Sequence, residues 1–275
     1  MDAKLDPNPT WVCDKLGATR AIDEIAKHAA VGYDSEFDGV RIGEESCVGK
    51  ARVDVFSIAV PAGPITPVGF TPCKSWVFEG DLLTYGPVRA FLGASQVTKC
   101  VHNLTVDAHA AANQGVGIRG GLNTLSMARF VYPERANLAR GNYDLDSLCQ
   151  WRVGFGKVDD FTELFGYYDY EPYEEEVTKQ RCWGCGEVGC RKKKGLHELK
   201  ESVRVTVTRA KKVRRHHPLS GCRPGGPLGD KFSRYVKYAA ADAELALILY
   251  QMLLIDGRKE RAYPWTKLAS IVGVT

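Results

Sequence analysis

Asp34 and Glu36 are the first residues in this sequence whose types and spacing could perform chemistry. They lie two positions apart in residues 32–37, which the sequence predicts to be a strand, so both side chains project from the same face. Like charges this close disfavour one another unless a cation sits between them. The pair could therefore bind a cation, although a solvent-exposed strand face explains the same pattern.

Asp107 is a third acid in a suitable position. It follows a predicted strand and falls in the first turn of a helix predicted at residues 105–113. Acids favour helix N-termini because their side chains cap free N–H groups and interact well with the helix dipole. Helix capping is therefore a sufficient explanation of Asp107 taken by itself.

The last predicted helix, residues 232–254, is more informative. Tyr238 and Asp242 share one stripe of this helix with apolar residues. A buried aspartate without a partner costs several kcal/mol, so a positive charge should compensate Asp242. Tyr238 fits core packing as well as it fits a role in a site.

The remaining pattern predicts an α/β layer fold, because strands come first and helices are interleaved afterwards. Residues from 155 to 230 interrupt this order and read as one large insertion. Thr19 is the predicted cap of the first helix. Strands are predicted at 32–37, 51–60, 75–79 and 96–101, and helices at 20–30, 87–92, 105–113, 122–130, 145–153 and 232–254.

At these residues the sequence resembles a known family. Asp-x-Glu, Asn-x3-Asp and Tyr-x3-Asp occur in order in GYDSEFD, KCVHNLTVDAHAAANQGV and YVKYAAADAELALILY. They resemble the three motifs of the DEDDy branch of DnaQ-like 3′→5′ exonucleases, and the segment between the last two resembles the family's "Leu-Asp-Ser-Leu" helix. The resemblance covers residues 20–155 and 232–254. It is nearest to the proofreading exonuclease domain of family A DNA polymerases, with RNase D-like enzymes second.

The resemblance implies an RNase H-like fold, with a mixed five-stranded sheet flanked by helices, formed by residues 1–154 and 231–275. It also implies two Mg²⁺ or Mn²⁺ ions. By this resemblance Asp34 bridges both ions, Glu36 and Asp242 bind one, Asp107 reaches the other, and Tyr238 positions the attacking water. Two positions depart from the family pattern, since Val106 replaces an aromatic residue and Asn123 an aspartate.

Four carboxylates suit this chemistry because hard divalent ions prefer oxygen ligands, and two such ions can activate water and stabilise the leaving oxyanion. A single-stranded DNA 3′ end is the expected substrate. An RNase D-like exoribonuclease and a non-catalytic nucleic-acid-binding scaffold are the alternatives. His102 and Asn103 are candidates to contact the nucleic acid near Asp107, although a structural role explains them better.

The insertion, residues 155–230, is basic and contains Cys and His. Between residues 179 and 237 there are 17 Lys or Arg against 4 Asp or Glu, which suggests a polyanionic partner or a solvated loop. The cysteines and histidines have the ligand types of a zinc site, but the spacing matches no standard finger, and a reduced, flexible basic loop without zinc is the alternative. The zinc candidates are Cys182, Cys185, Cys190, His197 and Cys222, and the nucleic-acid-binding candidates are Arg191, Lys192, Lys193, Lys194, Lys211, Lys212, Arg214 and Arg215.

The bulk composition, 44% hydrophobic and 25% charged residues, is that of an ordinary globular protein. No apolar run approaches the ~20 residues of a membrane helix, and the N-terminus lacks the order of a signal peptide. We therefore expect a cytoplasmic protein that does not enter a membrane. Since only a short segment follows the last motif, we expect a proofreading role to need a DNA polymerase on a separate subunit.

Overall fold

Strand β3 (Ala30–Asp38), which carries Asp34 and Glu36, lies inside a six-stranded sheet of order β2-β5-β4-β3-β6-β7. It runs antiparallel to β4 and parallel to β6. The other strands are β2 (Thr10–Val12), β4 (Arg52–Pro61), β5 (Cys73–Glu79), β6 (Thr98–Val101) and β7 (Gly121–Asn123). The sheet is mixed, as expected, but it has six strands rather than five because β2 adds to the edge beside β5.

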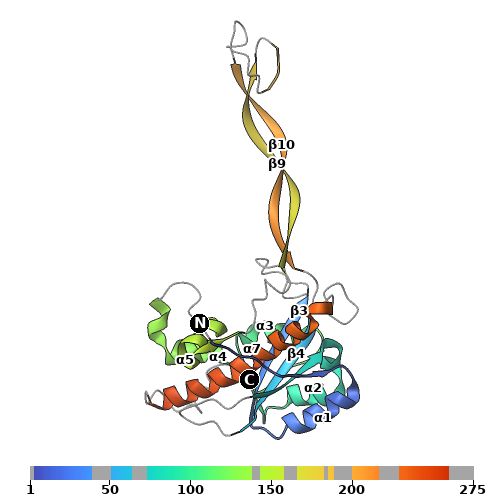
Figure 1. Ribbon diagram of the computed structural model, residues 1–275, viewed down its shortest axis with the longest axis vertical. Coiled ribbons are helices and arrows are strands. Elements are labelled where there is room, and N and C mark those ends of the chain that lie inside the picture. Colours follow the sequence, from blue (N-terminus) through green and yellow to red (C-terminus); the bar gives the residue numbers. More distant parts are fainter. Residues whose placement is uncertain are drawn as a thin grey trace. The chain divides into compact units, whose positions relative to one another are not determined.

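Helices cover both faces of this sheet (Figure 1). The structure, a computed structural model, describes residues 3–38, 51–63, 73–137, 143–157, 166–182, 185–188, 200–216 and 229–259. The helices are α1 (Lys15–Ile25), α2 (Gly86–Gly93), α3 (Leu104–Ala112), α4 (Thr124–Val131), α5 (Leu145–Val153) and α7 (Phe232–Lys259), and the 3-10 helices are η2 (Gly80–Thr84), η3 (Pro133–Asn137) and η6 (Gly229–Lys231).

The first helix begins earlier than predicted. The Asp14 side chain accepts a hydrogen bond of 2.7 Å from the Gly17 N–H group, so Asp14 and not Thr19 is the N-cap of α1. Thr19 lies inside the helix and its hydroxyl donates to the Lys15 carbonyl oxygen. An aspartate at this position satisfies free N–H groups at least as well as a threonine does, which explains the correction.

Helix α7 crosses one face of the sheet, in contact with β3, β4, β5 and β6, and α4 and α5 pack against it. Apolar residues of α1 and α2 cover the opposite face, where they join the largest cluster of buried side chains. Residues 229–257 are long and apolar enough to cross a membrane by length and composition, but 83% of the relevant window is buried inside the protein. That burial is typical of a core helix.

A separate compact unit, Phe165–His217, contains one long antiparallel hairpin of strands β9 (Gly166–Cys182) and β10 (Lys200–His216). This unit spans fewer residues than the insertion expected at 155–230. Its start differs because β8 (Phe155–Gly156) pairs in parallel with β1 (Ala3–Lys4), which places residues 155–156 in the larger unit.

Candidate active site

Asp34, Glu36 and Asp242 come together in the structure. One carboxylate oxygen from each lies within 4.8 Å of the other two, which is a separation that a single cation can span. Asp34 and Glu36 are half-buried on β3, whereas Asp242 is 5% exposed on α7. The sequence motifs therefore converge as expected, although 206 positions of the chain separate Glu36 from Asp242.

Asp107 lies beside this group but is turned toward the strand backbone. Its Oδ1 atom accepts hydrogen bonds from the Ser35 N–H group at 2.9 Å and from the Ser35 hydroxyl at 2.6 Å. Strand β6 pairs with β3 only at residues 30–32, so the Ser35 N–H group lies beyond that pairing and is satisfied by Asp107 instead. Asp107 is thus fixed to Ser35, the residue between Asp34 and Glu36 in the sequence, without belonging to the group of three.

Close contact between α7 and β3 brings Asp242 to the strand. A Cβ atom on Gly32 would lie 1.9 Å from the Ala243 carbonyl oxygen, so the helix backbone occupies the space where any side chain would begin. The Ser57 hydroxyl of β4 donates to the Ala239 carbonyl oxygen at 2.7 Å on the same side of the sheet. The sequence signal was present in the glycine two residues before Asp34.

Lys157 supplies the positive charge that the sequence predicts for Asp242. Its Nζ atom is 2.7 Å from Asp242 Oδ2 and 5.4 Å from the centre of the Tyr238 ring. The Lys157 backbone N–H donates to Asp146 of α5 at 2.6 Å, which fixes where the lysine begins. Sequence reasoning missed Lys157 because residue 157 had been assigned to the insertion.

Burial and mutual repulsion raise the pKa of all four carboxyl groups. Burial, with repulsion from Asp242 next, raises the pKa of Glu36 to about 8. Burial raises the pKa of Asp107 to about 7, although the Ser35 hydrogen bonds oppose this. The pKa values of Asp34 and Asp242 also rise through burial, and Lys157 opposes the rise of both. The group therefore holds excess negative potential that one lysine does not neutralise.

The residues present fit a divalent cation. Asp242 Oδ1 is buried and has no hydrogen-bond partner within the part of the chain that the structure describes. A buried carboxylate oxygen without a donor is costly, and a cation beside Asp34 and Glu36 would satisfy it. Tyr238 is buried near Asp242, and its hydroxyl lowers the pKa of the Asp242 carboxyl.

His102 and Asn103 have structural partners. The two ring nitrogens of His102 lie 3.0 Å from the Thr124 hydroxyl and 3.0 Å from the Tyr143 carbonyl oxygen, and burial lowers its pKa to about 4. Asn103 has the left-handed backbone conformation, with φ of 64°, at the start of α3. Its N–H donates to the Asn123 side chain, which also accepts from the Leu125 N–H and caps α4, so Asn123 has a structural role here.

The candidates in the insertion are only partly described. Cys182 is buried and Cys185 is exposed at the end of β9, and Gly186 follows with a φ of 72°. The backbone positions of Lys211, Lys212, Arg214 and Arg215 lie on β10, but their side chains are outside the described residues. Cys190, His197, Cys222 and the run Arg191, Lys192, Lys193 and Lys194 also lie outside the described residues.

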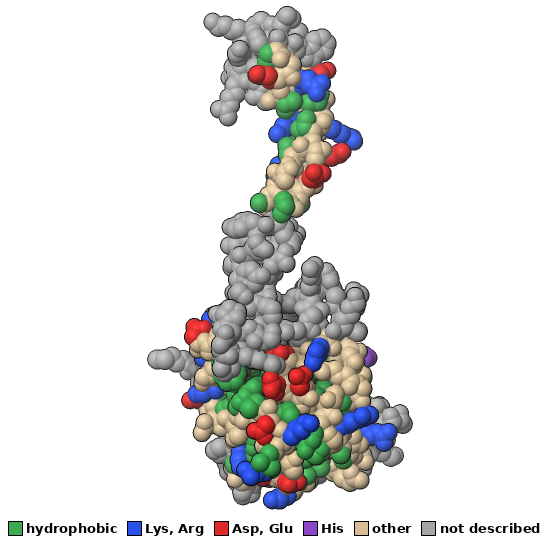
Figure 2. All heavy atoms as spheres, turned by 90° about the vertical axis from the view of Figure 1, so that its right-hand side faces the viewer, with side chains coloured by type: hydrophobic (Ala, Val, Ile, Leu, Met, Phe, Trp, Pro, Cys, Tyr) green, Lys and Arg blue, Asp and Glu red, His purple; other side chains and the backbone are tan. Residues whose placement is uncertain are grey.

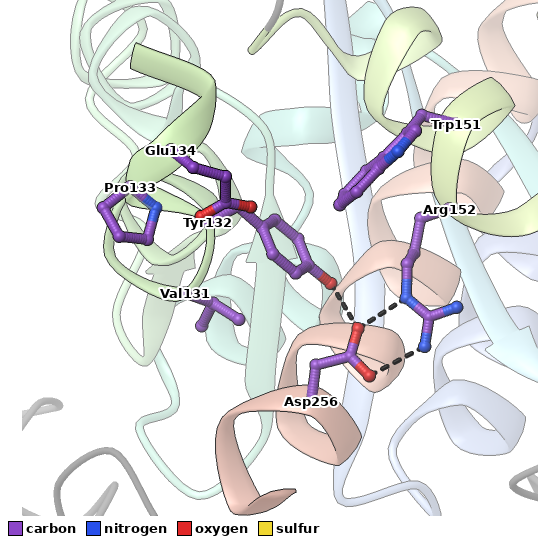
Figure 3. Close-up of a pocket in the computed structure, with 7 residues that line it drawn as sticks. All are labelled: Val131, Tyr132, Pro133, Glu134, Trp151, Arg152 and Asp256. Carbon is purple, nitrogen blue, oxygen red and sulfur yellow. Dashed lines mark hydrogen bonds and ion pairs between the residues drawn. The ribbon is translucent and has the colours of Figure 1, made fainter. Parts of the chain in front are cut away.

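A separate hollow lies near the C-terminal end of α7 (Figure 3). The Asp256 carboxylate accepts bonds from the Arg152 guanidinium and, at 2.6 Å, from the Tyr132 hydroxyl. Asp256 is 14 residues from Asp242 along the helix, which is about 21 Å at the helical rise of 1.5 Å per residue. The hollow is therefore distinct from the carboxylate group, and its Tyr132, Arg152 and Asp256 side chains are bonded to one another.

Comparison with known proteins gives a fold but no close relative. No protein-family model and no curated protein matches the sequence. Among solved structures, Escherichia coli RNase D, an exoribonuclease, is 13% identical with a TM-score of 0.53, and the match covers 96% of this chain and 50% of that one. The EXO domain of Aedes aegypti Nibbler is 9% identical with a TM-score of 0.50, and the match covers 98% of both chains.

The Pol1 POL domain of M. smegmatis, solved with a DNA primer-template, is 15% identical over 52% of this chain and 22% of that one, with a TM-score of 0.39. The chain thus spans about a fifth of the length of that structure and half the length of the RNase D chain. At these identities the comparisons establish the fold. The larger unit has an α/β fold with a mixed six-stranded sheet flanked by helices. This fold is similar to that of the RNase D and Nibbler structures.

Proposed function

We propose that this chain is a metal-dependent 3′→5′ exonuclease that hydrolyses phosphodiester bonds at single-stranded DNA ends. The observation that carries the proposal is the meeting of Asp34, Glu36 and Asp242 within 4.8 Å, on a fold similar to that of RNase D and Nibbler. The motifs predict two further residues. Asp107 is hydrogen-bonded to Ser35, and the Tyr238 ring lies beside Lys157.

The chain's own residues would hold two Mg²⁺ or Mn²⁺ ions through Asp34, Glu36, Asp107 and Asp242. Such ions, when bound, polarise the phosphate and lower the pKa of an attacking water. Asp242 Oδ1 is available for this while Lys157 holds Oδ2 at 2.7 Å and opposes the rise that burial causes in the pKa of the carboxyl. Tyr238 has a hydroxyl beside Asp242 and little rotamer freedom, so it can orient a water by hydrogen bonding.

A second candidate, an RNase D-like exoribonuclease, is favoured by the fold similarity to RNase D. The discriminating assay uses matched DNA and RNA oligonucleotides labelled at either end, with and without Mg²⁺ or Mn²⁺. We expect ladders that shorten from the 3′ end, only with metal, and faster on DNA. Faster RNA shortening selects the exoribonuclease, and binding without cleavage selects the non-catalytic scaffold.

Variants make this assay specific to the site. Asp34→Ala and Asp242→Asn should each reduce the cleavage rate by at least about 100-fold, because each removes an oxygen ligand. Asp23→Asn, an exposed position on α1, is the matched control and should retain full activity. Full activity in the Asp34 or Asp242 variant contradicts the proposal.

Zinc binding at the end of the hairpin is a second part of the proposal. The Gly186 N–H donates to the Cys182 carbonyl oxygen at 2.7 Å and the Cys182 N–H donates to the Glu187 carbonyl oxygen, so Cys182 lies close to the residues that follow Cys185. A glycine suits position 186 because its φ is positive. Cys182 and Cys185 would be two ligands, with Cys190 and either His197 or Cys222 as the others.

Metal analysis of the purified protein tests the zinc site. We expect about one zinc per chain, lost in Cys182→Ser and in Cys185→Ser but retained in Cys13→Ser, which changes an exposed cysteine of the larger unit. Zinc-free protein with an intact hairpin contradicts this part of the proposal and leaves the nuclease part untouched.

The basic residues Arg191, Lys192, Lys193, Lys194, Lys211, Lys212, Arg214 and Arg215 are proposed to contact the nucleic-acid backbone. Changing each run to glutamate should weaken binding of single strands and flatten its salt dependence by about 0.7 per lost phosphate contact. The cleavage rate at saturating substrate should stay unchanged.

A DNA polymerase on a separate chain is the partner that a proofreading role would need, and copurification tests it.

A further inference from the structure

The two faces of the β9–β10 ribbon differ in composition. Residues paired in the register share a face, and one face carries Val177, Val203, Val205 and Val207, which we call the valine face. All four valines are half-buried, whereas the opposite face is exposed and polar, with threonines at 178, 206 and 208. Figure 2 shows hydrophobic side chains interspersed with basic and acidic ones along the ribbon.

A two-stranded ribbon is marginally stable in water when its apolar face has no cover. Among the described residues of this unit, no third strand or helix packs on the valine face. A contiguous apolar face without cover is a candidate interaction surface. The question is which partner it fits.

The charges around the valine face have a two-fold pattern centred on the facing pair Val177 and Val205. On β10, Glu201 and Arg209 stand four residues before and four residues after Val205. On β9, Glu175 and Lys179 stand two residues before and after Val177. Within residues 173–181 and 201–209, each acid of this face is thus matched by a base at the same distance on the other side of the centre, and Arg181 is matched by Tyr173.

This is the arrangement that a two-fold symmetric interface needs, since every residue must suit its own symmetry mate. The two-fold axis passes through the centre, between the two ribbons and perpendicular to their strands. Rotation about it places β10 of one copy over β10 of the other, with the two strands running in opposite directions. Glu201 then faces Arg209 of the second copy, Glu175 faces Lys179 of the second copy, and the valines face valines. An unrelated partner would give no reason for this matching.

We propose that the valine face is a homodimer interface, with a second copy of this chain as its occupant. Because the centre lies five residues from the end of the ribbon, two copies can overlap only over residues 172–182 and 200–210, a face about 36 Å long and about 10 Å wide, on the order of 360 Å² per partner. Stable standard interfaces bury about 800 Å² per partner, so the dimer forms and dissociates in the micromolar range. The proposal is independent of the nuclease chemistry.

Sedimentation velocity of the full chain across the micromolar range tests the dimer. We expect the mass to rise from monomer to dimer with concentration. Val205→Glu places two like charges at the symmetry axis and should weaken dimerisation by at least about tenfold, because like charges that meet across an interface are disfavoured. Thr206→Glu, one residue away on the exposed face, is the matched control and should dimerise normally.

Charge inversion separates contact between chains from contact within one chain. Within a chain, Glu201 pairs with Arg181 at 3.7 Å and Arg209 pairs with Glu175 at 2.9 Å. Glu201→Lys and Arg209→Glu should each weaken the dimer, and the double variant should restore it because residues 201 and 209 face each other across the axis. If these residues pair only within one chain, the double variant should dimerise more weakly than either single variant, because it breaks both internal pairs.

Three results overturn the proposal. The first is a monomer at every concentration, and the second is equal dimerisation of the Val205 and Thr206 variants. The third is a double variant weaker than both single variants. If the chain stays monomeric and Val205→Glu weakens oligonucleotide binding more than Thr206→Glu does, the valine face serves nucleic acid and not a second copy.

Discussion

Lys157 precedes Asp242 by 85 residues, yet its Nζ atom lies 2.7 Å from the Asp242 Oδ2 atom. Asp146 fixes the lysine backbone, and α7 fixes the aspartate. Burial alone would lower the pKa of Lys157, but the carboxylates of Asp242, Asp34 and Glu36 raise it above its ordinary value. The lysine is therefore charged, and it is the counter-ion of the acidic group in the metal-free protein.

Lys157→Met should destabilise the metal-free protein and strengthen its binding of Mn²⁺. Removing one partner of a largely buried ion pair leaves the other charge uncompensated, at a cost of about 1–3 kcal/mol for a pair that keeps some exposure. The same change removes a positive charge that repels an incoming cation. Denaturant unfolding measures the first effect, and titration with Mn²⁺ measures the second.

Lys157→Arg is the matched control because it retains the charge at this position. It should retain most of the stability and the metal affinity of the original protein. A Met variant that unfolds and binds Mn²⁺ as the original protein does would show that the 2.7 Å pair has no energetic role.

Gly32→Ala should reduce the cleavage rate by about 100-fold or more. The new Cβ atom would lie 1.9 Å from the Ala243 carbonyl oxygen, so α7 must move away from β3 and carry Asp242 with it. Misplacing a catalytic group by about 1 Å typically costs about 100-fold in rate, and overpacking costs about 1–3 kcal/mol of stability. Rate measurements and thermal unfolding on the same preparation check both.

Gly93→Ala is the control for a glycine without such a contact. A Cβ atom there meets nothing within 4 Å, so stability and rate should stay unchanged. Equal behaviour of the two alanine variants would mean that the close approach of α7 to β3 does not position Asp242.

The sequence predicted most of the larger unit because its elements follow simple periodicities. The strand with Asp34 and Glu36, the 145–153 helix and the start of the last helix at 232 agree with the structure within about two residues. The first helix was misplaced because Asp14, five residues before Thr19, offered a cap that the pattern of apolar residues did not reveal. Strand β2 has three residues, too few for a periodic signal.

The rest of the site depends on contacts between distant segments. The motifs identified the carboxylates, but no local pattern indicates that Lys157 turns toward Asp242 or that Asp107 bonds to Ser35. The hairpin was read as an interruption because charges dominate it. Alternation was nevertheless visible in Val203, Val205 and Val207, which lie on β10.

Asp256→Ala should destabilise the protein by about 1–3 kcal/mol while changing the cleavage rate little. The Asp256 carboxylate joins the end of α7 to Arg152 of α5 and to Tyr132 after α4, and its side chain is 14% exposed. Because it lies about 21 Å along the helix from Asp242, its loss should not disturb the carboxylate group. Unfolding in urea and steady-state rates together check this, and a rate loss larger than the stability loss would place the hollow in the catalytic machinery.

The metal-free protein should lose stability as the pH rises from about 4 to about 8. Glu36 and Asp107 have raised pKa values of about 8 and about 7 in the folded state, so across this range the folded protein binds more protons than the unfolded chain. Stability then falls with rising pH, because deprotonation is easier in the unfolded state. The melting temperature should therefore fall across this pH range.

Mg²⁺ or Mn²⁺ should reverse that drop at pH 8 and have little effect at pH 5, where protons compete for the same oxygens. Calorimetry at both pH values, with and without the ion, measures this difference directly. Asp34→Asn, which removes one negative charge from the group, should flatten both the pH dependence and the metal effect. A melting temperature that rises with pH in the metal-free protein would mean that the four acids do not share one buried, repulsive environment.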